Sequence, residues 1–150
     1  MIVGRKAVLA ASKEVYITHS PGETEALGEA LAPRLAQAPA IALYGGLGMG
    51  KTAFTRGLAR GLGSQAPVSS PTYAIVNEYH GPRKICHFDL YRLPNADALW
   101  DIGWEDYLAS GAVCVTEWSE NTPGAFPPGT AEIHFRRLDD ETREITVILC

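Results

Sequence analysis

The sequence predicts an α/β domain: a three-layer sandwich with a partly parallel central sheet to which antiparallel hairpins are added. Its 150 residues are the usual size of one domain. Residues 40–62 place a short apolar strand, a glycine-rich loop and an amphipathic helix directly after one another. Other short apolar runs are bounded by turn residues, and two pairs of them have hairpin spacing. We therefore expect one domain over residues 1–150.

The N-terminal region is expected to contribute one strand after a loose arm. Residues 1–12 show no convincing period and are assigned to the arm. Residues 14–20 alternate, with Val15, Ile17 and His19 on one side of the expected strand.

A helix is expected to begin directly after this strand. Ser20 can cap its N-terminus, Pro21 suits the first helical position, and Glu23 completes a capping box. Pro33 is expected to kink or end the helix, because proline lacks an N–H group and clashes with the preceding turn. The apolar face is expected to consist of Ala26, Leu27, Ala30, Leu31 and Leu35.

The remaining elements follow from apolar runs and the turn residues between them. Gly103 is expected to separate two helical pieces. In order, we expect a strand at 40–44, a helix at 51–62, strands at 73–79 and 84–91 joined by a tight turn, helical pieces within 95–110, a strand at 112–116, and a hairpin of 131–138 with 142–149.

Composition and charge limit the possible functions. The chain is 46% hydrophobic and 20% charged, which is typical of globular domains and argues against disorder. A net charge of −4 gives little electrostatic reason to bind a bare polyanion tightly, so a nucleic acid would be held mainly by a partner. The three cysteines show no zinc spacing, and Cys86 and Cys114 lie in apolar runs typical of buried thiols.

The same composition points to the cytoplasm. The first twenty residues lack the long apolar segment of a signal peptide. No apolar stretch of 18 residues is present, so we expect no membrane span and no membrane partner.

Residues 45–52, GGLGMGKT, match the phosphate-binding P-loop pattern in full. Glycines let successive N–H groups turn inward around an anion, and the following helix places its positive end beneath the phosphates. Lys51 would contact the β and γ phosphates, and the Thr52 hydroxyl is a natural Mg²⁺ ligand. We therefore expect a bound nucleoside triphosphate, with cofactor-binding residues Gly45, Gly46, Leu47, Gly48, Met49, Gly50, Lys51 and Thr52.

Two acidic residues end apolar strands and are candidates for the metal site. Asp89 follows the run ICHF, and Glu117 follows VCVT. A buried carboxylate is costly without a nearby cation, and ligands sit at the carboxyl ends of parallel strands. Glu117 could ligate Mg²⁺ through water or polarise the attacking water, and the sequence does not decide between these roles.

The loop SSPT is a candidate for sensing the γ-phosphate, with Thr72 as the hydroxyl. No N-K-x-D guanine motif follows the P-loop, so we expect adenine as the base. The absence of an arginine-rich lid counts against a small-molecule kinase, which normally encloses its acceptor. Arg56, Arg92 and Arg136 are candidates to reach the γ-phosphate, alongside an arginine from a partner.

Several of these segments together resemble a bacterial ATPase family of tRNA threonylcarbamoyladenosine biosynthesis, TsaE. The segments are GGLGMGKTAFTRGLARGLG, SSPTYAIVNEY, HFDLYRL and the pair Glu117-Trp118. The opening stretch SPGETEALGE is also similar, so the resemblance covers about residues 13–149. One departure is Ser119, which stands where proline is common in the family.

The resemblance implies a P-loop NTPase fold and slow, Mg²⁺-dependent ATP hydrolysis. It implies two partner proteins, a threonylcarbamoyl transferase and its companion subunit, through which tRNA is reached indirectly. By position it places Lys51 and Thr52 on the phosphate and magnesium residues and makes Thr24 a base-side candidate. The catalytic set it implies is Lys51, Thr72, Asp89 and Glu117, and the metal set is Thr52, Asp89 and Glu117.

Three hypotheses of function follow. The leading one is an ATPase subunit of a tRNA-modification complex, with hydrolysis stimulated by the partners. The alternatives are a small-molecule kinase that uses the same P-loop and a nucleotide-sensing switch without useful turnover.

Overall fold

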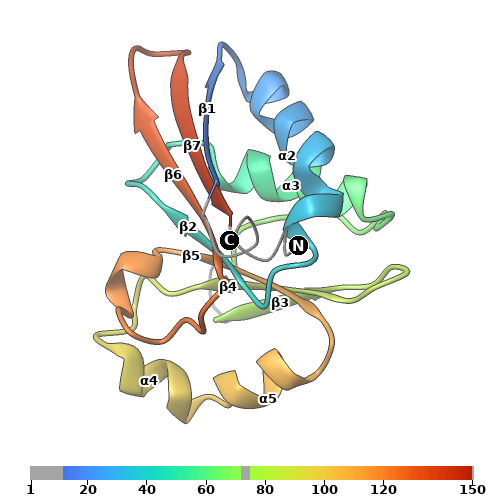
Figure 1. The fold of residues 1–150 in the computed structure, drawn as a ribbon, viewed down its shortest axis with the longest axis vertical. Helices are drawn as coiled ribbons and strands as arrows, with labels where there is room; N and C mark the ends of the chain where they lie inside the picture. Colours follow the sequence, from blue (N-terminus) through green and yellow to red (C-terminus); the bar gives the residue numbers. More distant parts are fainter. Residues whose placement is uncertain (1–11, 72–74, 150) are drawn as a thin grey trace, which may run out of the picture.

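The computed structural model describes residues 12–71 and 75–149, and its centre is a seven-stranded mixed sheet (Figure 1). The strand order is β1-β7-β6-β2-β5-β4-β3. The strands are β1 (Ser12–Thr18), β2 (Ile41–Tyr44), β3 (Val76–Tyr79), β4 (Ile85–Asp89), β5 (Val113–Glu117), β6 (Ala131–Arg137) and β7 (Arg143–Leu149). The helices are α2 (Pro21–Leu35), α3 (Lys51–Gly61), α4 (Ala96–Asp101) and α5 (Trp104–Ala109), with a short 3-10 helix, η1, at Ser119–Asn121.

The pairing of the strands confirms the predicted α/β class. β2 pairs in parallel with both β5 and β6, and β4 pairs in parallel with β5. The hairpins β3–β4 and β6–β7 are antiparallel, and β1 is added antiparallel to β7. The sheet is therefore parallel at its centre and antiparallel toward both edges.

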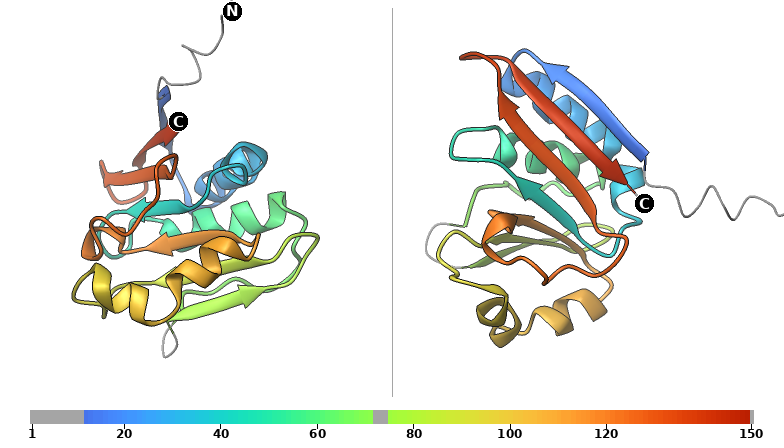
Figure 2. Two further views of the ribbon diagram at one scale, coloured as in Figure 1. Left: turned by 60° about the horizontal axis from the view of Figure 1, so that its bottom comes forward. Right: turned by 60° about the vertical axis from the view of Figure 1, so that its left-hand side comes forward.

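Helices lie on both faces of the sheet but cover it unequally (Figures 1 and 2). On one face α2 and α3 bury an apolar core that includes Leu35, Phe54 and Leu58 against β2 and β6. On the other face α4 and α5 pack Leu99 and Trp104 against β4 and β5. Within the described residues no helix covers the outer side of β1, β7 and β6 (Figure 2). The sheet thus has a half that is covered on both faces and an open half.

Strand β1 lies where it was predicted, and its buried face is the one that carries Tyr16 and Thr18. Tyr16 and Thr18 point toward α2 and the core, whereas Val15 and Ile17 are 55% and 44% exposed. The two apolar side chains lie on the uncovered side of the open half, and the core is filled by the opposite face. The expected arm at residues 1–12 is shorter than predicted, because Ser12 already pairs with Leu149, and the rest of it lies outside the described residues.

Helix α2 begins as predicted, with Ser20 accepting a hydrogen bond from the Glu23 N–H and Pro21 in the first turn. Glu23 accepts from the N–H of His19, one residue earlier than the capping box predicts. Pro33 does not end the helix, which continues to Leu35.

The predicted apolar face of α2 is wrong in part. Ala26 and Ala30 are exposed, and the buried residues are Thr24, Gly28, Leu31, Ala32 and Leu35. The reason is the close approach of α3, which needs glycine where the two helices meet. A Cβ atom on Gly57 would lie 1.8 Å from the Glu25 carbonyl oxygen, so a larger residue would force the helices apart.

The other predicted elements are confirmed with small changes in their bounds. The first strand of the β3–β4 hairpin begins at Val76, and the preceding residues 72–74 lie outside the described residues. Gly103 separates α4 from α5 as predicted. Cys86 and Cys114 are both 1% exposed and face each other in the register of β4 and β5, which confirms them as core thiols. None of the described helices combines the length and the apolar character needed to cross a membrane.

Candidate functional site

The P-loop connects the end of β2 to the start of α3. The chain leaves the sheet after Tyr44 and enters α3 at Lys51. Gly45, Gly48 and Gly50 have φ angles of +146°, +73° and +102°, which side-chain-bearing residues rarely adopt. The glycines of the motif are therefore required by the backbone path that wraps this loop onto the N-terminus of α3.

A cleft of about 320 Å³ lies along the P-loop. Strands β4 and β5 end beside it, with Asp89 opposite Glu117 in the parallel register. The two acids predicted from separate strands thus lie side by side. The cleft is lined by Leu47, Gly48, Met49, Gly50, Lys51, Thr52, Ala53, Ser70, Asp89, Glu117 and Trp118, while Gly45 and Gly46 form the entry of the loop.

Lys51 is only 5% exposed and is held inside the loop. Its Nζ atom donates a hydrogen bond of 2.6 Å to the Gly45 carbonyl and lies 4.0 Å from the centre of the Trp118 ring. Burial lowers the pKa of Lys51, and the nearby carboxylates of Glu117, Glu120 and Asp89 oppose that shift. The acids therefore favour the charged form of a lysine that would otherwise be costly to bury.

Trp118 reaches Lys51 because its own backbone is in the left-handed region, with φ +60°. This conformation is uncommon for a bulky residue and turns the chain sharply at the end of β5. Tyr91 packs against the other part of the Trp118 ring, with 5.0 Å between ring centres. The Glu117-Trp118 pair thus lines the cleft with a carboxylate and covers the lysine with an aromatic ring.

Thr52 and Glu117 are in direct contact. The Thr52 hydroxyl donates to Oε2 of Glu117 at 3.3 Å, and the glutamate is 4% exposed. Asp89 is more open, and its Oδ1 accepts a hydrogen bond from the Tyr91 N–H at 3.0 Å. Hydroxyl and carboxylate oxygens are the ligands that Mg²⁺ prefers. The donor set therefore fits a magnesium ion.

The described residues contain no group of three or more His, Cys, Asp or Glu placed to hold a metal alone.

His87 and Tyr79 belong to the site, and the sequence did not indicate them as functional residues. His87 is fully buried, and its Nε2 donates to Oε2 of Glu117 at 2.6 Å. Its Nδ1 lies 2.9 Å from the Tyr79 hydroxyl, which is also 2.8 Å from the Ser69 carbonyl and has one proton for these two acceptors. The one available signal was the histidine of HFDLYR, because residues two apart on a strand share a face, which places His87 on the same face of β4 as Asp89.

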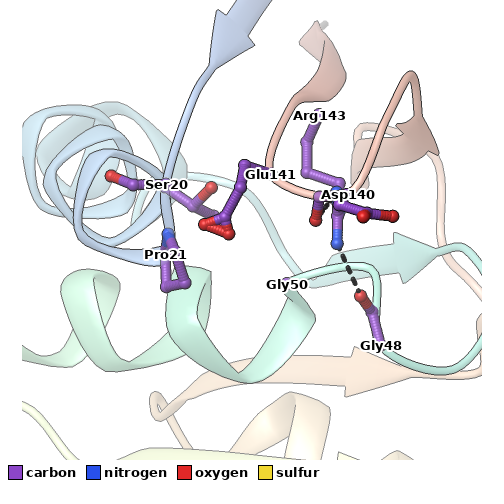
Figure 3. A pocket seen from close by; sticks show the side chains of 8 residues that line it. Ser20, Pro21, Gly48, Gly50, Asp140, Glu141 and Arg143 are labelled. Atoms are coloured by element: carbon purple, nitrogen blue, oxygen red, sulfur yellow. Dashed lines mark hydrogen bonds between the residues drawn. The ribbon is translucent and has the colours of Figure 1, made fainter.

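A second, smaller pocket of about 100 Å³ shares Gly48 and Gly50 with the cleft (Figure 3). Thr24, the base-side candidate, lines it, and its hydroxyl is hydrogen-bonded to that of Thr18 at 2.7 Å. Figure 3 shows Arg143 reaching the Gly48 carbonyl, at 3.2 Å. The pocket is completed by Ser20, Pro21, Asp140 and Glu141.

Asp140, Glu141 and Arg143 were predicted only as part of a hairpin. No local pattern marks them as site residues, because only the tertiary structure brings the β6–β7 hairpin beside the P-loop. Of the other candidates, Thr72 lies outside the described residues. Arg56 and Arg136 pair with Glu25 and Glu144. None of the three candidate arginines is among the described residues that line the cleft.

Comparison with known proteins gives consistent matches. The family described as "Threonylcarbamoyl adenosine biosynthesis protein TsaE" matches residues 18–145. A tRNA threonylcarbamoyladenosine biosynthesis protein TsaE from Treponema pallidum is 37% identical over 131 residues, covering 87% of this chain and 97% of the relative. The protein of the same name from Haemophilus influenzae is 41% identical over 109 residues, covering 72% and 68%.

The fold also matches a solved structure. The crystal structure of YdiB from Bacillus subtilis superposes with a TM-score of 0.74 at 30% identity, covering 93% of this chain and 87% of that one. The family match spans the P-loop, the strand ends with Asp89 and Glu117, and most of the β6–β7 hairpin. The chain therefore belongs to the TsaE family.

Proposed function

We propose that this chain binds ATP with Mg²⁺ and hydrolyses it slowly, as a subunit needed to form threonylcarbamoyladenosine in tRNA. The observation that carries the ATPase proposal is one cleft that joins the P-loop, Lys51, Thr52 and the two strand-end acids. The tRNA role is supported by family membership and by the names of the relatives.

The phosphate end of the nucleotide belongs in the larger cleft. Backbone N–H groups of residues 45–52 and the N-terminus of α3 form an anion-binding surface. Lys51 adds a mobile positive charge, and the Gly45 carbonyl that it now contacts is a weaker partner than a phosphate. Thr52, Glu117 and Asp89 would hold the metal, which when bound neutralises charge on the phosphates.

Glu117 is the residue best placed to act on water. It is the buried carboxylate of the cleft, and its carboxylate is oriented by two hydrogen bonds. It would orient the attacking water or accept its proton, or hold the metal through water. Asp89 is more exposed, and its carboxylate accepts a hydrogen bond from the Tyr91 N–H. It would act as a metal ligand.

The base belongs in the smaller pocket beside Thr24. This pocket shares Gly48 and Gly50 with the phosphate cleft, so one nucleotide can occupy both. The carboxylates of Asp140 and Glu141 are hydrogen-bond acceptors, which suits the amino group of adenine.

The partners would be the threonylcarbamoyl transferase and its companion subunit, in the cytoplasm. The net charge of −4 favours tRNA contact through these partners. ATP binding and turnover by this chain would support repeated cycles of the complex without carrying out the transfer itself.

The test is ATP hydrolysis by the purified chain, alone and with the partner pair and tRNA. We expect slow release of phosphate alone and a clear stimulation in the complex. Equal slow rates in both cases would argue against the role in the complex. A robust transfer of phosphate to a metabolite in a parallel screen would favour the kinase.

A further inference from the structure

A buried hydrogen-bond network lies behind the cleft and links two parts of the site. The network consists of Ser69, Tyr79, His87, Glu117 and Thr52, which belong to five different segments of the chain. Its middle members are shielded from water: Tyr79 is 4% exposed, His87 0% and Glu117 4%. We call this set the His87 network.

At the cleft end, the His87 network fixes one oxygen of the catalytic carboxylate. His87 Nε2 and the Thr52 hydroxyl both donate to Oε2 of Glu117. Among the described residues Oε1 receives no hydrogen bond, so this oxygen is available to a water or a metal. Because the imidazole is itself held at Nδ1, the direction of the carboxylate is set by a side chain that lies outside the cleft lining.

At the other end, the network holds Ser69, the first residue of the SSPT segment. The Tyr79 hydroxyl lies 2.8 Å from the Ser69 carbonyl and 2.9 Å from His87 Nδ1, so its single proton serves one of these two acceptors at a time, and the Ser69 N–H donates to the same hydroxyl at 3.3 Å. Asn77 donates a second hydrogen bond to the Ser69 carbonyl, at 3.1 Å. The next residue, Ser70, lines the cleft. A movement of this loop would therefore change the hydrogen bonding of the His87 ring through Tyr79.

We propose that His87 is a positioning residue for ATP hydrolysis, which orients the Glu117 carboxylate, and that Tyr79 couples this orientation to the loop at Ser69. The proposal rests on the proposed ATPase function. It concerns side chains that neither line the cleft nor require contact with the nucleotide, so they act through Glu117.

The first test compares two substitutions of one residue. His87→Phe keeps an aromatic ring but removes both nitrogens, and we expect kcat for ATP to fall about tenfold or more, as for other residues that orient catalytic groups. The affinity for Mg-ATP, measured by calorimetry, is expected to change less than threefold by the same reasoning. His87→Gln retains an N–H donor that can reach Glu117 and is expected to recover most of kcat.

The second test asks whether Tyr79 acts through His87. Tyr79→Phe removes one oxygen and is expected to lower kcat by a smaller factor than His87→Phe does. The double variant with His87→Phe is expected to be no slower than His87→Phe alone, because the two groups act through one path. Tyr107→Phe is the matched control: this tyrosine packs edge-on against Phe88 in the α4–α5 layer, and its variant is expected to retain the wild-type kcat.

A third readout needs no nucleotide. Hydrogen exchange of the Ser69 amide is expected to accelerate in Tyr79→Phe and also in His87→Phe, although His87 does not contact Ser69. If the two side chains were merely structural, their substitution would lower the melting temperature. It would leave unchanged both kcat, measured at low temperature, and the exchange rate of the Ser69 amide. If His87→Phe does not fold, Tyr79→Phe and His87→Gln still decide the question.

The outcomes separate this proposal from the function on which it rests. Wild-type protein that binds no Mg-ATP would overturn both. Wild-type protein that hydrolyses ATP, with folded His87→Phe and Tyr79→Phe variants at wild-type kcat, would overturn the positioning role alone. A reduced kcat in His87→Phe that His87→Gln restores, with faster Ser69 exchange, would support it.

Discussion

Two histidine–glutamate pairs in one sheet show how burial changes the role of the same chemistry. His87 and Glu117 are 2.6 Å apart, with 0% and 5% of their side chains exposed. His134 and Glu132 are 2.9 Å apart, with 43% of each side chain exposed. The first pair lies in the covered half of the sheet, between β4 and β5, and the second lies along β6 in the open half.

The two pairs differ in how far they are exposed to solvent. In the open half, the ion pairs Arg136–Glu144 and Glu14–Arg34 are also at the surface, where such pairs contribute about 0–1 kcal/mol. In the covered half a carboxylate must be paired to be tolerated, and its orientation is then fixed. The covered half is accordingly where we expect substitutions to change activity, and the open half is where we expect small effects on stability.

The largest expected effect is on hydrolysis in Glu117→Gln. This change removes the charge at the buried end of the cleft, and we expect kcat to fall about 100-fold while ATP affinity changes little. Glu132→Gln makes the same change in the exposed pair and is expected to leave kcat unaltered. Phosphate release and calorimetry measure the two quantities. Parallel losses of binding and hydrolysis in Glu117→Gln would indicate that Glu117 is only structural.

Lys51→Ala is expected to weaken Mg-ATP binding about 10- to 100-fold, because a charge-assisted contact to phosphate is lost. Arg136→Ala removes a cation from the open half and serves as the control, since Arg136 is paired with Glu144 outside the cleft. Titration calorimetry compares the two variants with the wild type. An unchanged dissociation constant in Lys51→Ala would contradict the assignment of the lysine.

Asp89→Asn is expected to raise the Mg²⁺ concentration for half-maximal hydrolysis about threefold to tenfold, because one of the two carboxylates near the metal becomes neutral. The effect is smaller than for Glu117 because Asp89 is more exposed to solvent. A magnesium titration at saturating ATP measures it. Superimposable curves for variant and wild type would remove Asp89 from the metal site.

The smallest expected effect is on acid stability and belongs to the open half. The Arg34 guanidinium, aided by the Tyr16 hydroxyl, lowers the pKa of Glu14 from 4.5 to about 2. The ionised carboxylate therefore stabilises the folded state above pH 4.5, and this contribution is lost as the pH falls from 4.5 toward 2.

For an exposed pair we expect this contribution to be about 0.5 kcal/mol. Urea unfolding at pH 6 and below pH 3 measures it, with Glu14→Gln as the comparison. The difference in unfolding free energy between wild type and variant is expected to shrink in acid. A constant difference at both pH values would show that the charge of Glu14 does not matter.

The covered half was also the better predicted half. The path from β2 through the P-loop to α3 is set by local sequence, because glycines permit positive φ angles and apolar residues recur at helical spacing. The partnership of Asp89 and Glu117 followed from one further rule, that parallel strands end at the same edge.

Contacts that depend on the packing of helices against the sheet and on exact strand register could not be predicted. Val15 and Ile17 look like a buried face, but only the tertiary packing of α2 decides that Tyr16 and Thr18 are turned inward. The expected helix face was wrong at Ala26 and Ala30 for the same reason, because Gly28 and Gly57 let the two helices approach each other closely. The contact of Tyr79 with His87 depends on the register of β3 and β4, which no residue pattern specifies.

The most direct measurement of the central claim is a calorimetric titration of the wild-type protein with Mg-ATP. If residues 45–52 surround the phosphates and the neighbouring acids hold the metal, one nucleotide is expected to bind per chain, and affinity is expected to drop when EDTA removes Mg²⁺. An absence of heat, together with an unprotected P-loop in hydrogen exchange at saturating Mg-ATP, would contradict the account.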